Sequence, residues 1–142
     1  MEKTVLVFGT FDAIHPGHRS FLTQARAKGT RLVVSVARDS FVIEKKRRRP
    51  VHSEQERMRH LLESGLVDEA HLGDERTGEY TILREVRPQV ICFGHDQDEL
   101  KADLMRWLAE HRAEFPAVEI ATLSAYRPEI YKSSKLNRQG SR

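Results

Sequence analysis

The sequence has a single cysteine, Cys92, and no apolar run long enough to cross a membrane. One cysteine excludes an internal disulfide and is typical of a reducing compartment, so we expect Cys92 to be a core thiol. A membrane span needs about 20 consecutive apolar residues, and no run in this chain approaches that length. A strand-like segment follows Met1 to Lys3 at once. We therefore predict a cytoplasmic protein without a targeting signal or a membrane partner.

A strong net charge is also missing, although charged residues are common. They make up 32% of the 142 residues, yet their charges cancel to +3. A field this modest does not indicate binding to nucleic acid. The one basic run, Lys45 to Arg49, lacks the interleaved aromatic residues and the broad basic face of nucleic-acid-binding modules. We expect no nucleic-acid partner, and the length fits one domain.

The segment Gly9–His18 predicts a phosphate-binding loop between a strand and a helix. The β-branched residues within Thr4–Phe8 favour a strand, and the glycine after them lets the backbone turn and approach a ligand. Pro16 suits the first turn of a helix, whose N-terminus attracts anions through its N–H groups and its dipole. His15 and His18 project to one side of that terminus. The segment thus predicts a polyphosphate site.

Further along the chain, apolar runs alternate with amphipathic segments, which is typical of a parallel sheet covered by helices. Strands are expected at Thr4–Phe8, Arg31–Ala37, Val67–Leu72, Gln89–Phe93 and Val118–Leu123. Helices are expected at Pro16–Lys28, Glu54–Glu63, Thr77–Val86 and Glu99–Glu114. We predict an α/β fold in a single domain, a Rossmann-like parallel sheet of about five strands flanked by helices. The domain covers residues 1–138, and residues 139–142 form a disordered tail.

Polar residues follow several of the predicted strands. Ligands of open α/β sheets bind beyond the carboxyl ends of the strands, so Asp39 and Gly94–Asp96 should meet the phosphate loop there. Asp96 could bind a base, a ribose or a hydrated Mg²⁺, or it could cap the next helix. Ser133 or Ser134 could cap a short final helix and create a second anion site. All of these side chains should converge on one edge of the sheet.

The basic run Lys45–Arg49 predicts a mobile, solvated loop, because five consecutive cations repel one another. Two interpretations stay open. The loop is a solubilising surface segment, or it is a flexible clamp in which a lysine folds over the phosphates of a nucleotide. Charge composition does not choose between them.

A zinc site formed by His15, His18 and His95 is a further alternative, since two histidines at a spacing of three residues can share a metal ion. We disfavour it, because structural zinc sites usually need four ligands and no cysteine or histidine cluster completes the set. The chain therefore predicts no metal site made of protein ligands.

The motifs together resemble those of the cytidylyltransferase-like nucleotidyltransferases, in order and over nearly the whole chain. They are Gly9-Thr10-Phe11-Asp12, His15-Pro16-Gly17-His18, Asp39, Pro50 with Glu56-Arg57, Gly94-His95-Asp96 and Ser133-Ser134-Lys135. The His-x-Gly-His element is the most specific of them. Among the small members, Tyr126–Lys135 and Val36–Asp39 look most like archaeal-type FAD synthases. Glycerol-3-phosphate cytidylyltransferases carry an Arg-Thr-x-Gly element where this chain has Tyr126–Glu129, which argues against their acceptor.

The resemblance implies transfer of a nucleotidyl group from an NTP to a phosphorylated acceptor, with release of pyrophosphate. ATP and FMN as substrates and FAD as product fit it best; the alternatives are CTP with glycerol 3-phosphate, and a nucleotide sensor without activity. Mg²⁺ would be held mainly by substrate and water, and a homodimer is left open. The implied catalytic residues are His15, His18, Lys45 and Lys46. The implied nucleotide-binding residues are Gly9, Thr10, Phe11, His15, Pro16, Gly17, His18, Asp96, Tyr126, Ser133 and Ser134.

Overall fold

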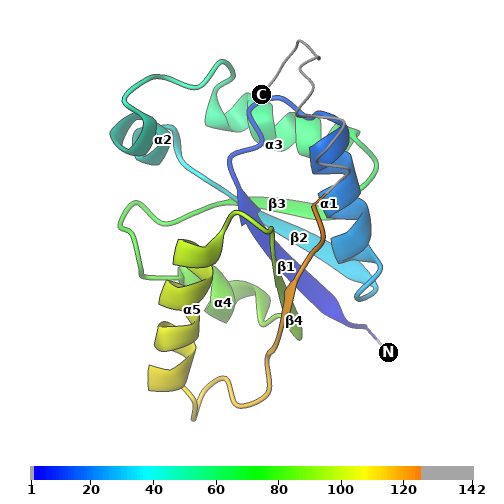
Figure 1. The fold of residues 1–142 in the computed structure, drawn as a ribbon, viewed down its shortest axis with the longest axis vertical. Helices are drawn as coiled ribbons and strands as arrows, with labels where there is room; N and C mark the ends of the chain where they lie inside the picture. Colours follow the sequence, from blue (N-terminus) through cyan, green and yellow to red (C-terminus); the bar gives the residue numbers. More distant parts are fainter. Residues whose placement is uncertain (1, 126–142) are drawn as a thin grey trace.

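The computed structural model of the chain describes residues 2–125, and the predictions for Tyr126, Ser133, Ser134 and the tail at 139–142 lie outside them. The described residues form one parallel sheet of five strands in the order β3-β2-β1-β4-β5 (Figure 1). The strands are β1 (Thr4–Gly9), β2 (Arg31–Val36), β3 (Glu69–Leu72), β4 (Val90–Phe93) and β5 (Glu119–Thr122). The helices are α1 (Pro16–Arg26), α2 (Asp39–Lys46), α3 (Glu54–Glu63), α4 (Thr81–Val86) and α5 (Asp98–Glu110).

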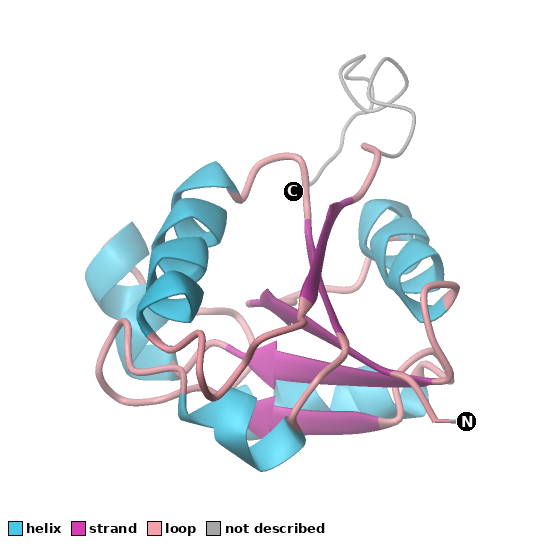
Figure 2. Cartoon of the chain, turned by 90° about the horizontal axis from the view of Figure 1, so that it is seen from below, coloured by secondary structure: helices cyan, strands magenta, loops and turns pink. Residues whose placement is uncertain are grey.

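Helices cover both faces of the sheet, as Figure 2 shows. Val5 and Val7 of β1 belong to one hydrophobic cluster, which includes buried side chains of α1 and α3. Leu6 belongs to a second cluster, which includes buried side chains of α4 and α5. The alternation of side chains along a strand thus sends apolar groups into two cores, which explains why β1 is apolar at successive positions. The predicted α/β class and the five-stranded parallel sheet are confirmed.

The strand order defines where a ligand should bind. β1 pairs with β2 on one side and with β4 on the other, so the connections from β1 and from β4 lead away in opposite directions. In open α/β sheets the crevice at such a switch point, beyond the carboxyl ends of the strands, is the usual ligand site. The segments after β1 and β4 therefore frame the candidate site.

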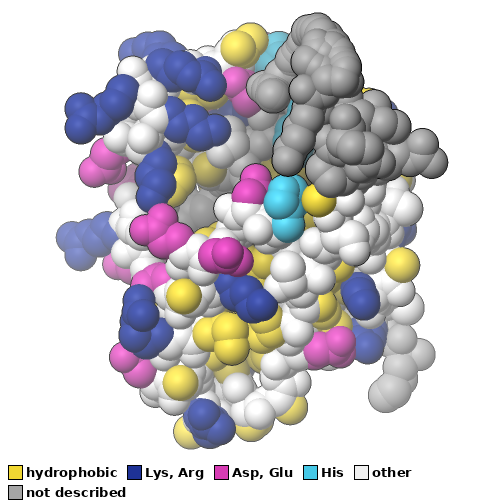
Figure 3. All heavy atoms as spheres, in the orientation of Figure 1, with side chains coloured by type: hydrophobic (Ala, Val, Ile, Leu, Met, Phe, Trp, Pro, Cys, Tyr) yellow, Lys and Arg dark blue, Asp and Glu magenta, His cyan; other side chains and the backbone are white. Residues whose placement is uncertain are grey.

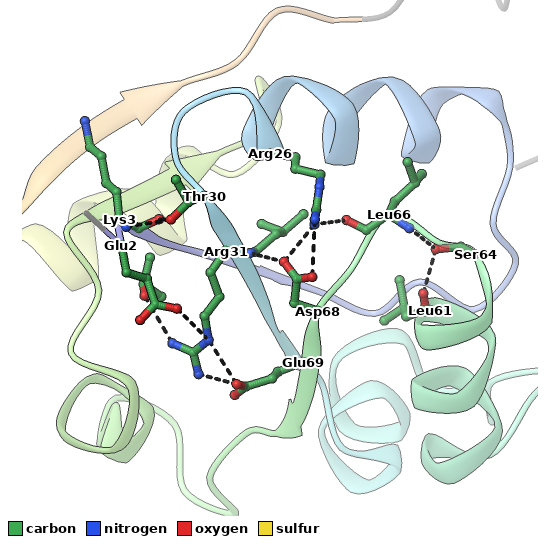
Figure 4. Close-up of polar contacts among 12 residues, drawn as sticks. Glu2, Lys3, Arg26, Thr30, Arg31, Leu61, Ser64, Leu66, Asp68 and Glu69 are labelled. Carbon is green, nitrogen blue, oxygen red and sulfur yellow. Dashed lines mark hydrogen bonds and ion pairs between the residues drawn. The ribbon is translucent and has the colours of Figure 1, made fainter.

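At the other end of the sheet, ion pairs connect α1 and β2 to the start of β3 (Figure 4). Arg26 donates to the Asp68 carboxylate at 2.7 Å, and the same carboxylate accepts from the backbone N–H of Leu32. Hydrogen bonding from Arg26 lowers the pKa of Asp68 below its ordinary value. Arg31 pairs with Glu69 in the same way. These contacts hold the sheet together far from the carboxyl ends of the strands and are structural.

The basic run differs from its predicted conformation. Lys45 and Lys46 lie in the last turn of α2, so the prediction of a mobile loop is wrong for both. The helix ends at Arg47, which has a left-handed backbone with a φ of 61°. Asp39 in the first turn and the lysines in the last turn complement the helix dipole, and the buried side chain of Val42 anchors the helix. These effects outweigh the repulsion between neighbouring cations.

The helix predicted at Thr77–Val86 is shorter, because α4 begins at Thr81. Tyr80 has a φ of 51°, which is outside the helical region, and its ring is buried in the second core. The Asp74 carboxylate accepts a hydrogen bond from the N–H of Thr81 at 2.7 Å. The residues before Thr81 therefore form a connection along the carboxyl ends of the strands. None of the helices in residues 2–125 is long and apolar enough to cross a membrane.

Candidate active site

The first turn of α1 holds its two histidines in a reciprocal capping arrangement. Nδ1 of His15 accepts from the backbone N–H groups of Gly17 at 3.0 Å and His18 at 3.4 Å. Nδ1 of His18 accepts in turn from the N–H of His15 at 3.4 Å. The two rings stack with their centroids 3.8 Å apart and an interplanar angle of 20°. Both imidazoles are thus fixed at the positive end of a helix, as the sequence predicts.

The imidazole of His18 is neutral at pH 7. Burial and the neighbouring His15 lower its pKa to about 4, although the Ala13 backbone and the charge of Asp96 act in the opposite direction. Lys46 lowers the pKa further. The charges that act on this ring come from the last turn of α2, which carries Lys46, and from Asp96 in the segment after β4.

Phe11 lies beneath the histidines instead of at the surface. Its side chain is 5% exposed, and its ring meets the ring of His18 edge-on at 5.2 Å. A Cβ at Gly9 would lie 2.5 Å from the Phe11 ring, so the missing side chain of Gly9 makes room for that ring. The nucleotide contacts expected of Gly9 and Phe11 stay predictions, and in this structure their backbones, not the ring of Phe11, are placed to make them. The ring of Phe11 supports His18.

A buried arginine connects the phosphate loop to the next two helices. Arg57 of α3 is fully buried and donates to the Thr10 carbonyl at 2.8 Å, to Asp39 at 2.7 Å and to the His52 carbonyl at 3.1 Å. Asp39 and Glu54 also exchange hydrogen bonds between side chain and backbone, which joins the starts of α2 and α3. Asp39 lies at the predicted edge of the sheet, but its carboxylate is engaged in this structural network.

Asp12, in the phosphate loop, binds the segment that leads from α2 to α3. Its carboxylate accepts from the backbone N–H groups of Val51 at 2.7 Å and His52 at 2.8 Å. Burial opposes ionisation of this group, but the two N–H donors and the charge of Arg57 outweigh it and lower the pKa of Asp12 below its ordinary value. The phosphate loop is thereby fixed to the segment that leads from α2 to α3.

Gln97 bridges the two strand ends that frame the crevice. Its amide NH₂ donates to the Phe8 carbonyl of β1 at 3.0 Å, and its amide oxygen accepts from the N–H of Gly94 at 2.8 Å. The side chain thus provides hydrogen bonds where β1 and β4 separate and the ladder between them ends. This role of Gln97 was not predicted from the sequence. Its position in the segment that follows β4, between Asp96 and the start of α5, is the only signal for it.

The cations of α2 lie on the other side of the crevice, and Figure 3 shows Lys and Arg side chains gathered over this helix. Nζ of Lys45 lies 3.6 Å from the Glu99 carboxylate in the first turn of α5. Lys46 is exposed and acts electrostatically on His18. His95 and Asp96 are also exposed. The structure therefore brings the predicted residues His15, His18, Lys46 and Asp96 to one place, and Lys45 borders it.

Two further expectations concern a metal site and the single cysteine. Within residues 2–125, no group of three or more His, Cys, Asp or Glu side chains could hold a metal ion. Cys92 is buried in β4, and burial raises the pKa of its thiol to about 11. Cys92 is thus a core thiol, as predicted.

Comparison with protein families identifies the fold. The model of the family described as cytidylyltransferase-like matches residues 6–139. The chain belongs to this family, which confirms the resemblance carried by the His-x-Gly-His element. A nucleotidyltransferase is the class of enzyme that the fold and the site define.

Individual relatives show which kind of nucleotidyltransferase this chain resembles. A protein from Methanocella arvoryzae named FAD synthase is 37% identical over 139 residues, which are 98% of this chain and 95% of the relative. One with the same name from Thermococcus onnurineus is 36% identical over 132 residues, covering 93% and 87% of the two chains. A third, from Methanosarcina barkeri, is 47% identical over 93 residues, and the match spans only 65% of that relative. The predicted resemblance to archaeal-type FAD synthases is confirmed.

Two solved structures share the fold of this chain. A lipopolysaccharide core biosynthesis protein from Thermoplasma volcanium superposes with a TM-score of 0.71 at 32% identity, over 89% of this chain and 99% of the other. Pantoate-beta-alanine ligase from Francisella tularensis reaches a TM-score of 0.60 at 13% identity, over 89% of this chain and 60% of its own. At that identity the second match shows the shared fold alone.

Proposed function

We propose that this chain transfers the adenylyl group of ATP to the phosphate of FMN, which gives FAD and pyrophosphate. An oxygen of the FMN phosphate attacks the α-phosphorus of ATP and forms the new P–O bond. The bond from the α-phosphorus to the oxygen that bridges to the β-phosphate breaks, and its electrons leave with pyrophosphate. The stacked pair of His15 and His18 at the N-terminus of α1 is the observation that carries the proposal. The names of the relatives support the choice of FMN and ATP.

This reaction requires alignment and charge neutralisation more than proton transfer. The attacking phosphate oxygen is already an anion, so a strong general base is unnecessary. Catalysis then consists of holding the two phosphates in line and stabilising the charge on the equatorial and leaving oxygens. The N–H groups of Gly17 and His18 are bonded to His15, so it is the positive end of the α1 dipole that suits the phosphates of the donor. Lys46, and Lys45 next to it, supply positive charge from the last turn of α2.

His15 and His18 have distinct tasks in this proposal. His15 shapes the helix N-terminus, because its Nδ1 accepts two backbone N–H groups. His18 enters the reaction as a neutral imidazole, and a triphosphate beside it favours the protonated form. The positive charge that stabilises the transition state at His18 then develops when substrate binds. Removal of one such donor typically costs about a hundredfold or more in kcat.

The nucleoside of ATP is proposed to lie beyond the phosphate loop. Thr10 and the backbones of Gly9 and Phe11 suit its edge. Asp96, which is exposed after β4, suits its ribose or base. The roles of Tyr126, Ser133 and Ser134 in binding the nucleotide rest on the resemblance alone, since these residues lie outside the described part.

Mg²⁺ is the divalent cation that this chemistry would use, and it would neutralise charge on the phosphates. Mg²⁺ is typically bound by one or two carboxylates together with substrate phosphates and water. Asp96 is an exposed carboxylate whose charge acts on His18, so a suitable donor lies close to the phosphate site. A cytoplasmic location stays a prediction of the sequence, and a homodimer stays open.

The test is product analysis with paired substrates. The protein is incubated with ATP or CTP, with Mg²⁺, and with FMN or glycerol 3-phosphate, and both pyrophosphate and the nucleotide product are measured. We expect FAD and an equal amount of pyrophosphate from ATP with FMN. Faster turnover of CTP with glycerol 3-phosphate would replace this function by the cytidylyltransferase alternative. Nucleotide binding without pyrophosphate from any pair would leave the sensor alternative.

A further inference from the structure

An exposed aromatic residue, Phe41, lies on α2, the helix whose lysines take part in the proposed function. Phe41 is 38% exposed, so part of its ring is open to solvent. It precedes Lys45 by four residues, so both side chains lie on one flank of the helix. Lys45 reaches Glu99 at the start of α5, which shows that this flank is turned towards α5. Phe41 therefore borders the space between α2 and α5.

Phe8 lies near the carboxyl end of β1, on the face of the sheet that α4 and α5 cover. It precedes the last residue of β1, and it packs against the core that α4 and α5 cover. Its ring meets that of Tyr80 edge-on at 6.2 Å and stacks on that of Phe93 at 6.4 Å. Phe8 is nevertheless only partly buried, although the strand before it is closed to solvent. An aromatic face is thus available at the carboxyl end of β1.

A buried hydroxyl lies beside Phe8. Ser35 is its register partner on β2 and is 4% exposed. Within residues 2–125 its hydroxyl has no hydrogen-bond partner, and it lies 3.5 Å from the position that a Cβ of Gly73 would take. Buried polar groups usually have a partner, so a ligand with polar edge atoms would satisfy this one.

The walls of the space are held in place by polar contacts. Arg38, just before α2, donates to the Gly73 carbonyl at 2.7 Å, so the connection from β3 to α4 closes one side. The Lys45–Glu99 pair spans the other side at 3.6 Å. Both members of that pair are largely exposed, so the contact contributes little free energy and opens easily. Figure 3 shows hydrophobic side chains in the hollow between the cations of α2 and the acidic side chains below them.

We infer that this space, bordered by Phe41 and Phe8, binds the ring system of the acceptor. The inference rests on the proposed function and deepens it. Phe41 and Lys46 are about 7.5 Å apart along the axis of α2, at a rise of about 1.5 Å per residue. A flavin mononucleotide carries its planar ring and its phosphate at the two ends of a ribityl chain. The phosphate then lies near Lys46 and His18, and the ring stacks between the aromatic side chains.

The test is steady-state kinetics of FAD formation by the full chain with Phe41→Ala, Phe41→Trp and Phe8→Leu. Leu62→Ala is the matched control, because Leu62 is an exposed apolar side chain (47%) on α3. We expect Phe41→Ala and Phe8→Leu to raise KM for FMN at least about fivefold, with KM for ATP nearly unchanged, and Phe41→Trp to restore FMN binding. The control should match the wild type. Thermal unfolding of each variant shows whether its fold is retained.

The outcomes separate the inference from the proposed function. If the wild type makes no FAD, the proposed function fails. If the wild type makes FAD and both aromatic variants keep the wild-type KM for FMN, the inference alone is wrong. An increase in KM for ATP instead would assign the aromatic space to the nucleotide and would also overturn the inference. Because Phe41 is on the surface, loss of folding in Phe8→Leu leaves Phe41→Ala as a valid test.

Discussion

The side-chain amide of Gln97 donates to the carbonyl of Phe8 at 3.0 Å, across the point where β1 and β4 separate. The same amide accepts from the N–H of Gly94. A single side chain thus fixes the spacing between the strand ends that frame the crevice. The segment that carries Asp96 depends on this spacing, which leads to the first prediction.

Gln97→Ala should reduce kcat/KM for ATP about tenfold and lower the free energy of unfolding by about 1–2 kcal/mol, because two hydrogen bonds are lost. Gln97→Glu keeps the acceptor for Gly94 but turns a carboxylate oxygen towards the Phe8 carbonyl, so its effect should be at least as large as that of Gln97→Ala. Gln55→Ala, at an exposed position of α3, is the control. Denaturant unfolding and initial rates measure both quantities. Equal activity of Gln97→Ala and the control would show that the bridge has no role in the site.

Arg57→Met should destabilise the protein by about 3–5 kcal/mol, because it leaves the Asp39 carboxylate without its buried partner. The Thr10 carbonyl also loses its donor. Arg59→Met on the same helix removes an exposed charge paired with Glu63 and should change stability by less than about 1 kcal/mol. Urea unfolding of both variants makes the comparison. Similar losses in the two would contradict the structural role of Arg57.

The lowered pKa of His18 predicts that the stability of the protein depends on pH. This pKa is about 4 in the folded protein and near the ordinary value of 6.5 in the unfolded chain, so between these values the unfolded state binds more protons. The stabilisation is complete above pH 6.5 and is lost as the pH falls towards 4. His18→Asn should flatten this part of the stability curve. An unchanged slope between pH 6.5 and 4 would mean that the pKa of His18 is not lowered.

The same pKa links ATP binding to protonation. Triphosphate beside His18 should raise its pKa, so ATP binding near pH 5 should take up protons from the buffer. Calorimetric titration in two buffers of different ionisation enthalpy measures this uptake. His18→Asn should reduce it. Proton uptake of equal size in the variant would assign the effect to another group.

Lys46→Ala should raise KM for ATP about tenfold, since Lys46 is the cation of α2 that acts on His18. Lys45→Ala should have a smaller effect, because Lys45 pairs with Glu99. Arg48→Ala, outside the helix, is the charge-matched control. Initial rates at varied ATP concentration distinguish the three variants. An effect of the control equal to that of Lys46→Ala would indicate a general electrostatic contribution.

The fold was largely predictable because its signals are local. The apolar runs of β1 and β2 and the Pro16 helix start specify the first β-α-β unit, and the capping box at Ser53 marks the start of α3. The conformation of Lys45 and Lys46 was not predictable from charge alone. Their helix depends on the dipole of α2 and on burial of Val42, which is a tertiary contact.

The contacts that hold the candidate site in place were harder to predict than the positions of His15 and His18 at the start of α1. An arginine is rarely fully buried, so its residue type alone does not predict the burial of Arg57. Its spacing of four from the buried Leu61 placed it on the inner face of α3, and this was the available signal. The role of Asp39 depends on Arg57 and on Glu54, which are brought close only by the fold. Such partnerships cross between elements and leave no pattern in one segment.

The most direct test of the central claim is the rate of FAD formation from ATP and FMN by the wild type and by His18→Ala. The site at the N-terminus of α1 is expected to form FAD with release of pyrophosphate. His18→Ala should reduce kcat about a hundredfold or more, with a smaller change in the Kd for ATP. An unchanged kcat in the variant, or no FAD from the wild type, would contradict the account.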